Sequence, residues 1–187
     1  MKENPMSGLK VLALCGSLRA KSTNKALLEY AKAHAPEGME IELADLTQVP
    51  FYNSDLATKP AAVERLLAQF AKADALLLAC PEYNYSIAPA LKNALDWASR
   101  EPNNELMAGK VAAILGSAGG MGSSRAQYHL RQVCVFLDLH LVNKPEVFCN
   151  AFANTFDADN NLTDERIQSL IVQQLDALQQ LALRFKN

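Results

Sequence analysis

The first residues that could do chemistry form a loop of hydroxyl and cationic side chains between an apolar run and a helix-forming stretch. The apolar run covers residues 11–15, and the loop after it contains Ser17, Arg19, Ser22 and Asn24. A helix N-terminus offers free N–H groups and a partial positive charge, so this composition favours a phosphate. The loop lacks the glycine patterns of dinucleotide and nucleoside triphosphate sites. It therefore predicts a terminal monophosphate, and the alternative is an ordinary capped helix beside an exposed arginine.

A second polar segment holds two tyrosines between two prolines, directly after another apolar run. It covers residues 81–89 and reads PEYNYSIAP. A planar heteroaromatic ring needs a rigid wall of this kind, with backbone donors and acceptors in its plane and an aromatic side chain beside it. The segment therefore indicates a site for such a ring, and the alternative is a rigid turn whose tyrosines are only packed.

A third segment, residues 116–124, follows the next apolar run and reads GSAGGMGSS. Four glycines in seven residues let the backbone come close to a flat ligand, because no Cβ atoms stand in the way. Glycine-rich loops are common in proteins, so this segment counts as evidence only beside the other two.

The elements around these segments are predicted by an alternation of two hydrophobic patterns. Short apolar runs predict strands at residues 11–15, 39–45, 74–80, 110–116 and 140–143. Apolar residues at helical spacing predict helices at residues 23–34, from Pro60, at 89–100, at 124–138, and a long final helix capped by Thr163. Such strands form a parallel sheet covered by helices on both faces, an α/β fold. In these folds ligands bind outside the carboxyl ends of the strands, where the three segments fall.

The composition of the chain excludes several classes of partner. A chain of 187 residues that is 50% hydrophobic is expected to form one domain over residues 1–187, with residues 1–8 flexible. A formal net charge of −2 offers no attraction for nucleic acid or an anionic membrane surface. No apolar run approaches the roughly 20 residues of a membrane span, so membrane insertion is not expected and the expected compartment is the cytoplasm.

Cysteines and histidines show no spacing typical of metal ligands. The four cysteines are expected to be core thiols rather than zinc ligands or disulfides: Cys15, Cys80, Cys134 and Cys149. The three histidines are expected to be surface or packed residues rather than catalysts: His34, His129 and His140. The sequence therefore predicts no metal site.

The three segments, taken in order with the stretch LKNALDW at residues 91–97, resemble the NAD(P)H-dependent FMN reductase family. The residues that carry the resemblance are Gly16-Ser17-Leu18-Arg19 with Ser22 and Asn24, and Pro81-Glu82-Tyr83-Asn84. The match is closest to the family's bacterial quinone and chromate reductase branch, which residues 127–132 and 143–146 also resemble. The resemblance implies a flavodoxin-like three-layer sandwich with a five-stranded parallel sheet in the order 2-1-3-4-5.

The resemblance also implies a set of cofactor-binding residues. The FMN phosphate is expected to be held by Ser17, Arg19, Ser22 and Asn24. The isoalloxazine ring is expected to be lined by Pro81, Glu82, Tyr83 and Asn84, and closed on its other side by Ser117 and Gly119. NAD(P)H is the expected co-substrate. Because the flavin does the chemistry, no side chain is expected to be an obligatory catalyst.

The function implied is that of an FMN-dependent NAD(P)H:quinone oxidoreductase that transfers hydride through flavin N5 in ping-pong order. Promiscuity toward chromate, azo and nitro acceptors goes with the resemblance. One alternative is an FMN reductase that releases reduced flavin to a monooxygenase. A more distant alternative is a flavodoxin-type electron carrier, against which the near-neutral charge balance and Arg19 argue.

A homo-oligomer, a dimer or a dimer of dimers, is the expected assembly. Trp97 falls off the inward face of its helix, on the side of Asn93, so we expect it to meet a partner subunit, and the alternative is a local pocket. The residues expected to reach a neighbour's flavin pocket are Phe51, Tyr52 and Asn53. Those expected in a second interface are Arg125, Tyr128 and Glu146.

Overall fold

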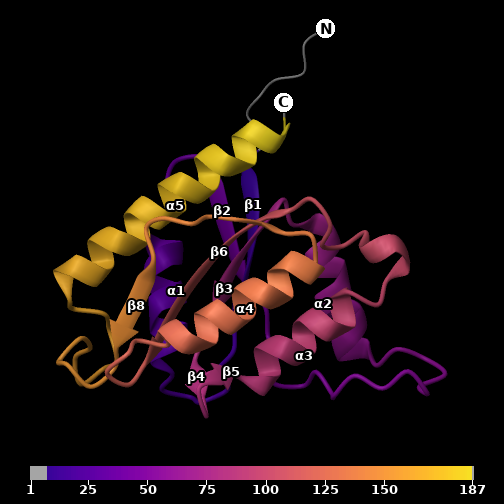
Figure 1. Ribbon diagram of the computed structural model, residues 1–187, viewed down its shortest axis with the longest axis horizontal. Helices are drawn as coiled ribbons and strands as arrows, with labels where there is room; N and C mark the ends of the chain where they lie inside the picture. The colour runs from indigo at the N-terminus through magenta and orange to yellow at the C-terminus, as the bar shows by residue number, and fades with distance from the viewer. Residues whose placement is uncertain (1–7, 187) are drawn as a thin grey trace, which may run out of the picture.

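A parallel sheet forms the middle layer of the structure, a computed structural model that describes residues 8–186, with side chains to residue 185 (Figure 1). Its strands follow the order β2-β1-β3-β6-β7, and β8 also pairs with β6. Their bounds are β1 (Leu9–Cys15), β2 (Met39–Leu43), β3 (Ala75–Ala79), β6 (Val111–Ala118), β7 (His140–Leu141) and β8 (Val147–Asn150). The predicted order 2-1-3-4-5 is confirmed. Residues 1–8 were expected to be flexible, and all of them except Gly8 lie outside the described residues.

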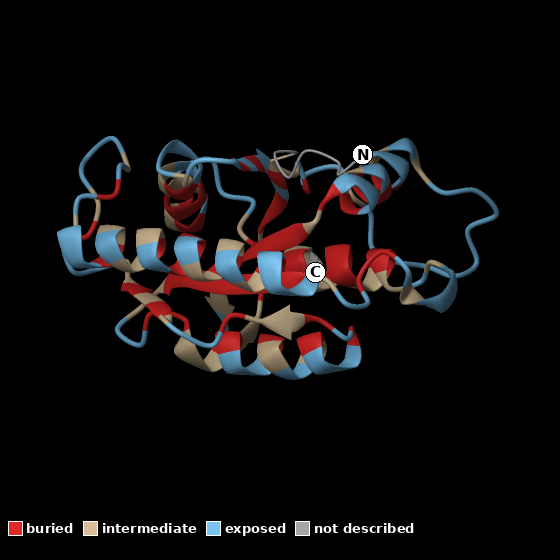
Figure 2. Ribbon diagram, turned by 90° about the horizontal axis from the view of Figure 1, so that it is seen from above, coloured by how far each residue is buried: buried red, intermediate tan, exposed pale blue. Residues whose placement is uncertain are grey.

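Helices cover both faces of the sheet, as predicted. One face carries α1 (Thr23–Ala33) and α5 (Glu165–Lys186); the other carries α2 (Ala61–Lys72), α3 (Pro89–Ala98) and α4 (Ser124–Phe136). A short 3-10 helix, η1 (Pro102–Asn104), follows α3. Alternate residues of each strand point to opposite faces, so Leu77 packs with α1 and α5 while Leu76 and Leu78 pack with α2 to α4. Figure 2 shows the buried residues between the layers.

The burial of each strand matches its position in the sheet. All five residues of the central β3 are buried, whereas the edge strand β2 alternates buried and exposed positions. This is the pattern expected for an interior strand and an edge strand of a parallel sheet covered on both faces. No helix among the described residues is long and apolar enough to cross a membrane.

The fifth strand position differs from the prediction of one strand at residues 140–143. Two separate segments fill it: β7 pairs with the start of β6 and β8 pairs with its end. The register places His140 opposite Val111 and Val147 opposite Leu115. The predicted fifth strand is therefore confirmed at His140–Leu141, and β8, which extends the same position along β6, was not predicted.

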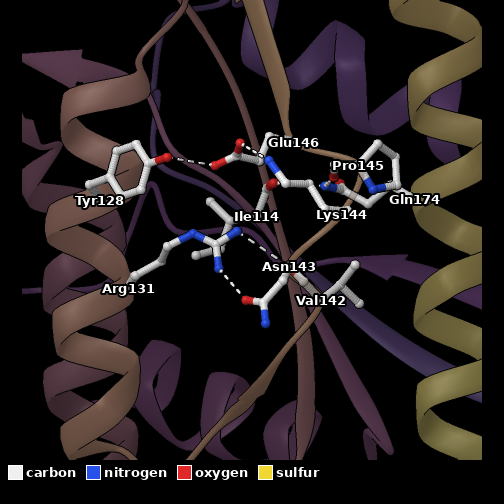
Figure 3. Close-up of polar contacts among 9 residues, drawn as sticks. All are labelled: Ile114, Tyr128, Arg131, Val142, Asn143, Lys144, Pro145, Glu146 and Gln174. Atoms are coloured by element: carbon white, nitrogen blue, oxygen red, sulfur yellow. Dashed lines mark hydrogen bonds and ion pairs between the residues drawn. The ribbon is translucent and has the colours of Figure 1, made fainter.

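A side chain from α5 bridges the gap between the two segments. The N–H of Val142 donates to the Ala112 carbonyl at 2.9 Å, and the chain then leaves the ladder before Pro145, which has no N–H to donate. The next free carbonyl of β6, that of Ile114, accepts instead from Gln174 Nε2 at 3.0 Å. The same nitrogen donates to the Pro145 carbonyl at 2.9 Å (Figure 3). Gln174 therefore replaces the backbone hydrogen bond that the sheet loses.

Two local features also differ from the sequence prediction. The segment at residues 81–89 contains a small antiparallel hairpin of β4 (Glu82–Tyr83) and β5 (Ser86–Ile87). Asp164, rather than Thr163, caps α5: its Oδ1 atom accepts from the N–H of Ile167 at 3.0 Å. The Thr163 hydroxyl donates to the Thr155 carbonyl at 3.2 Å instead.

Candidate functional site

Three loops meet at the carboxyl-terminal edge of the sheet, the lower edge in Figure 1. Since β1, β3 and β6 are parallel neighbours, the segments that follow them emerge side by side. The N–H of Gly16 donates to the Ala79 carbonyl at 2.9 Å, and that of Cys80 to the Leu115 carbonyl at 2.8 Å. A Cβ atom at Gly16 would lie 2.7 Å from Pro81 Cδ, so glycine permits the close approach of the first two loops.

The first loop ends in the N-terminus of α1. Ser22 is the N-cap residue and is buried, and its hydroxyl accepts from the N–H of Lys25 at 3.2 Å. The first hydrogen bond along the helix runs from the N–H of Ala26 to the Ser22 carbonyl. The N–H groups of Thr23 and Asn24 precede that bond, so they are donors available to an anion.

Arg19 and Ser17 lie on the same loop ahead of the helix. Arg19 is exposed, and among residues 8–185 no carboxylate pairs with its guanidinium. Ser17 is half-buried and lines a cavity of about 320 Å³ together with Arg19 and Lys25. An unpaired cation beside a helix N-terminus favours an anionic ligand.

Asn24 and Ser117 are joined directly, although 93 residues separate them in sequence. The Asn24 side chain donates to the Ser117 carbonyl at 2.8 Å and accepts from the Ser117 N–H at 2.9 Å. Both residues are buried. The Asn24 amide therefore ties the first turn of α1 to the end of β6, and the group that Asn24 offers to an anion is its backbone N–H.

The Glu82 side chain points to α4. Its carboxylate accepts from Arg125 Nε at 2.7 Å and from the N–H of Ala126 at 3.3 Å. Ser123, the N-cap residue of α4, makes no capping hydrogen bond with its side chain, so Glu82 supplies this function from the hairpin. The Arg125 guanidinium also lies 3.7 Å from the ring centroid of Tyr85. These contacts fix the hairpin against the N-terminus of α4.

The remaining predicted residues occupy the hairpin and the third loop. Pro81 is buried, and Tyr83 is 44% exposed. Asn84 begins the turn of the hairpin with a φ of 49°, a conformation that asparagine tolerates better than most residues. Gly119 follows β6 and lies beside the ring of Phe152, which a Cβ atom on the glycine would meet at 3.5 Å.

A cavity of about 490 Å³ opens between the first loop, the hairpin and residues 46–51. Arg19 and Tyr83 are the predicted binding residues that line it, together with apolar side chains that include Leu18 and Phe51. The volume lies within the range typical of small-molecule sites. The contribution of residues 46–50 was not predicted, because they follow the edge strand β2 and carry no motif. Phe51, expected to reach a neighbour, lines the cavity of its own chain.

The cysteines offer no nucleophile at neutral pH. Burial raises the pKa of the Cys80 and Cys134 thiols to about 12 and that of Cys149 to about 11. Burial also raises the pKa of Cys15, whose thiol donates to the Ser17 carbonyl at 3.4 Å. The four residues are therefore protonated thiols under ordinary conditions.

The histidines lie apart from one another and from the cavity. His34 stacks on Tyr30, His140 stacks on an aromatic ring of α5, and His129 Nδ1 lies 3.1 Å from the Ser86 hydroxyl. Among the residues with described side chains, no group of three or more His, Cys, Asp and Glu residues could hold a metal ion.

The expectation that Trp97 is exposed toward a partner subunit is wrong. Trp97 is only 4% exposed, and its Nε1 donates to the Pro50 carbonyl at 2.8 Å. The connection between β2 and α2 folds back over α3 and covers the indole ring, with Tyr52 packed edge-on against it. The local pocket, the alternative considered from the sequence, is the correct interpretation.

The residues expected in a second interface make contacts within their own chain. Tyr128 Oη donates to Glu146 Oε1 at 2.9 Å, and Lys144 Nζ donates to Glu146 Oε2 at 2.6 Å (Figure 3). The bond from Lys144 holds the pKa of Glu146 below its ordinary value. Arg125 pairs instead with Glu82. The hydrogen bond from Tyr128 joins α4 to the segment between β7 and β8, and the ion pair of Arg125 joins α4 to the β4–β5 hairpin.

Comparisons with known proteins point to one family. The model of the NADPH-dependent FMN reductase family matches residues 9–154. An NAD(P)H-dependent FMN reductase of Pseudomonas aeruginosa is 54% identical over 182 residues, which cover 96% of this chain and 98% of the relative. An NAD(P)H:quinone oxidoreductase of Solanum tuberosum is 50% identical over 187 residues, which cover 96% and 95%.

A solved structure has the same fold over nearly its whole length. It is the flavoenzyme NAD(P)H:(acceptor) oxidoreductase FerB of Paracoccus denitrificans, which superposes with a TM-score of 0.85 at 31% identity. The match covers 95% of this chain and 98% of that one.

Proposed function

The chain belongs to the NADPH-dependent FMN reductase family, and from this membership we propose that it is an FMN-containing NAD(P)H:quinone oxidoreductase. The observation that carries the proposal is the Arg19 guanidinium, which pairs with no carboxylate of the described residues, beside the N-terminus of α1 and on the rim of a cavity with apolar walls. A ligand with a dianionic end and a planar apolar end suits this combination.

The donor set fits the phosphate of FMN. Arg19 supplies a charge-assisted hydrogen bond, and the hydroxyls of Ser17 and Ser22 supply further donors. Asn24 contributes its backbone N–H, because its side chain is held by Ser117. A dianion at this place gains from the helix dipole as well.

The wall of the isoalloxazine ring is proposed from the second and third loops. We place the ring against the hairpin residues Pro81, Glu82, Tyr83 and Asn84, with Ser117 and Gly119 closing the other side. Glu82 acts by holding the hairpin to α4, since its carboxylate is directed away from the cavity. The contacts with the ring then come from the backbone of the hairpin and the Tyr83 side chain.

The side chains bind and orient rather than transfer protons. FMN, when bound, supplies the hydride chemistry. The thiols near the site have raised pKa values, and no side chain of the cavity need act as acid or base. One cavity must receive NAD(P)H and the quinone, so the oxidised nicotinamide leaves before the acceptor enters. The same open, apolar wall supports promiscuity toward azo and nitro compounds, and the Arg19 cation on its rim supports the reduction of chromate.

Spectra and initial rates test the proposal. Apoprotein titrated with FMN is expected to quench the fluorescence of the flavin and to gain melting temperature. With the holoenzyme, NAD(P)H is expected to abolish the visible absorbance and a quinone to restore it, with parallel double-reciprocal plots. Intersecting plots would exclude ping-pong order, and an FMN titration without quenching or stabilisation would remove the basis of the proposal.

An FMN reductase that releases its reduced flavin is the second candidate. The name of the Pseudomonas aeruginosa relative and the exposure of Arg19 at the phosphate loop favour it. Gel filtration separates the two candidates: a yellow colour that stays with the protein supports the quinone reductase, and colourless protein with free flavin supports the reductase.

We further propose a homo-oligomer, either a dimer or a dimer of dimers, and a cytoplasmic location. Val135 and Phe136 on the last turn of α4 are 80% and 73% exposed, which supports an interface there. Four free cysteines suit a reducing compartment.

A further inference from the structure

Two side chains of α3, Asn93 and Trp97, lie outside the predicted set of cofactor-binding residues, although Asn93 lines the cavity of about 490 Å³. Both contact the long connection between β2 and α2, which runs past α3 at the lower right of Figure 1. The Pro50 carbonyl accepts from Asn93 Nδ2 at 2.9 Å and from Trp97 Nε1 at 2.8 Å. The Tyr52 N–H donates to Asn93 Oδ1 at 2.8 Å. We call residues 50–52 the strap, because its main chain is tied to α3 on both sides of its central residue.

The anchors of the strap are buried. Asn93 is 8% exposed and Trp97 is 4% exposed. The Tyr52 ring packs edge-on against the indole, with centroids 5.0 Å apart, and the Arg100 guanidinium lies 5.9 Å from the Tyr52 centroid. Breaking these bonds is unfavourable, because the buried Asn93 amide and Trp97 N–H would lose their partners. The anchors therefore restrict the strap to one conformation.

The central residue of the strap, Phe51, behaves differently from its neighbours. It is 77% exposed, although the residues on either side are anchored. Its ring lines the cavity of about 490 Å³ together with Tyr83 and Leu18. So exposed a ring contributes little to the folded core, whereas an aromatic side chain in a cavity wall, on an anchored main chain, can stack on a planar ligand.

We propose that Asn93 and Trp97 are positioning residues that hold Phe51 in the wall of this cavity, where its ring selects planar aromatic electron acceptors by stacking on them. The inference rests on the proposed function, which makes the cavity the place of the acceptor. Stacking favours a two-ring quinone. A compact inorganic acceptor such as ferricyanide has no ring face and gains nothing from Phe51.

The substitution Phe51→Ala tests the stacking contact. We expect kcat/KM for a naphthoquinone to fall about tenfold, which corresponds to about 1.4 kcal/mol, and kcat/KM for ferricyanide to change less than twofold. The two acceptors share the reaction with NAD(P)H, so their ratio isolates the acceptor step. Calorimetry without NAD(P)H is expected to give a tenfold weaker Kd of the quinone for the oxidised holoenzyme. Leu56→Ala, an exposed apolar side chain of the same connection, is the matched control.

The substitution Asn93→Ala tests the positioning. We expect it to lower kcat/KM for the naphthoquinone as much as Phe51→Ala does, and the double variant to lose no more than either single one. Trp97 is the only tryptophan of the sequence, so its emission is expected to shift to the red when the strap detaches. Trp97→Phe keeps most of the packing and removes the hydrogen bond from the indole N–H to the Pro50 carbonyl. It replaces Asn93→Ala in the test if that variant fails to fold.

Several results would overturn the inference. An unchanged Kd of the quinone for the Phe51→Ala protein would do so, and so would equal losses of kcat/KM for the quinone and for ferricyanide. Additive losses of kcat/KM in the double variant of Phe51→Ala and Asn93→Ala would also contradict it. Where Asn93→Ala fails to fold, the double variant of Phe51→Ala and Trp97→Phe takes its place. A lower mass of the Phe51→Ala protein in solution would assign the ring to a neighbouring subunit and overturn it too. A wild-type protein that binds no FMN or reduces no quinone would instead contradict the proposed function itself, and this result is distinct from those above.

Discussion

At the scale of single residues, Arg19 is the clearest candidate for a direct role in binding. Its guanidinium is exposed, has no carboxylate partner among the described residues, and lies on the loop that ends in the N-terminus of α1. We predict that Arg19→Ala weakens FMN binding about tenfold, because a charge-assisted hydrogen bond contributes about 1.5–3 kcal/mol and exposure favours the low end. Arg19→Lys is expected to lose less, since it keeps the charge. Flavin fluorescence titrations measure both.

Lys32→Ala is the control for this prediction, since Lys32 is an exposed cation at the other end of the same helix. Its Kd for FMN is expected to stay within twofold of the wild-type value. An Arg19→Ala protein that binds FMN as the wild type does would place the phosphate elsewhere.

At the scale of elements, Gln174 holds together a sheet whose last strand is divided. Its amide nitrogen donates to the carbonyls of Ile114 and Pro145, where a continuous strand would have used its backbone. We predict that Gln174→Leu destabilises the fold by about 2–4 kcal/mol, because each unpaired buried carbonyl costs about 1–3 kcal/mol. The melting temperature is then expected to fall by about 5–10 °C for a chain of this size.

Gln173→Leu is the matched control, since the neighbouring side chain is exposed and donates a hydrogen bond to Ser169 on its own helix. Thermal unfolding is expected to place it within 2 °C of the wild type, roughly the range of a surface substitution. Equal melting temperatures for the two variants would show that Gln174 does not support the strand.

At the scale of the whole molecule, the exposed apolar side chains of α4 make a testable surface for assembly. We predict that Phe136→Asp shifts the protein toward the monomer at micromolar concentration, because a carboxylate in an apolar interface would be desolvated without a partner. Light scattering coupled to gel filtration measures the mass. Leu183→Asp, an exposed position of α5 in the opposite layer, is expected to leave the mass unchanged. A wild-type protein of monomeric mass would contradict the proposed oligomer.

The hydrophobic pattern was sufficient to predict a parallel sheet covered on both faces and the place of the site, and the family resemblance supplied the order of the strands. Burial on both faces leaves a continuous apolar run at β3, and burial on alternate positions marks the edge strand β2. Parallel strands put the ends of β1, β3 and β6 at one edge, so the three polar segments had to meet. These features depend on residues that are close in the sequence, and a local pattern therefore reveals them.

Contacts between distant residues decided the rest. The Trp97 indole donates a hydrogen bond to Pro50, and the Asn24 side chain is hydrogen-bonded to Ser117. In the gap of the fifth strand, Gln174 donates to the free carbonyl of β6. None of these pairings leaves a periodic signal, because each depends on where two separate parts of the chain come to lie. Local patterns of residues were thus enough to predict the sheet, its helices and the site at its edge. Which polar side chains are free to meet a ligand depends on contacts that form only when the chain is folded.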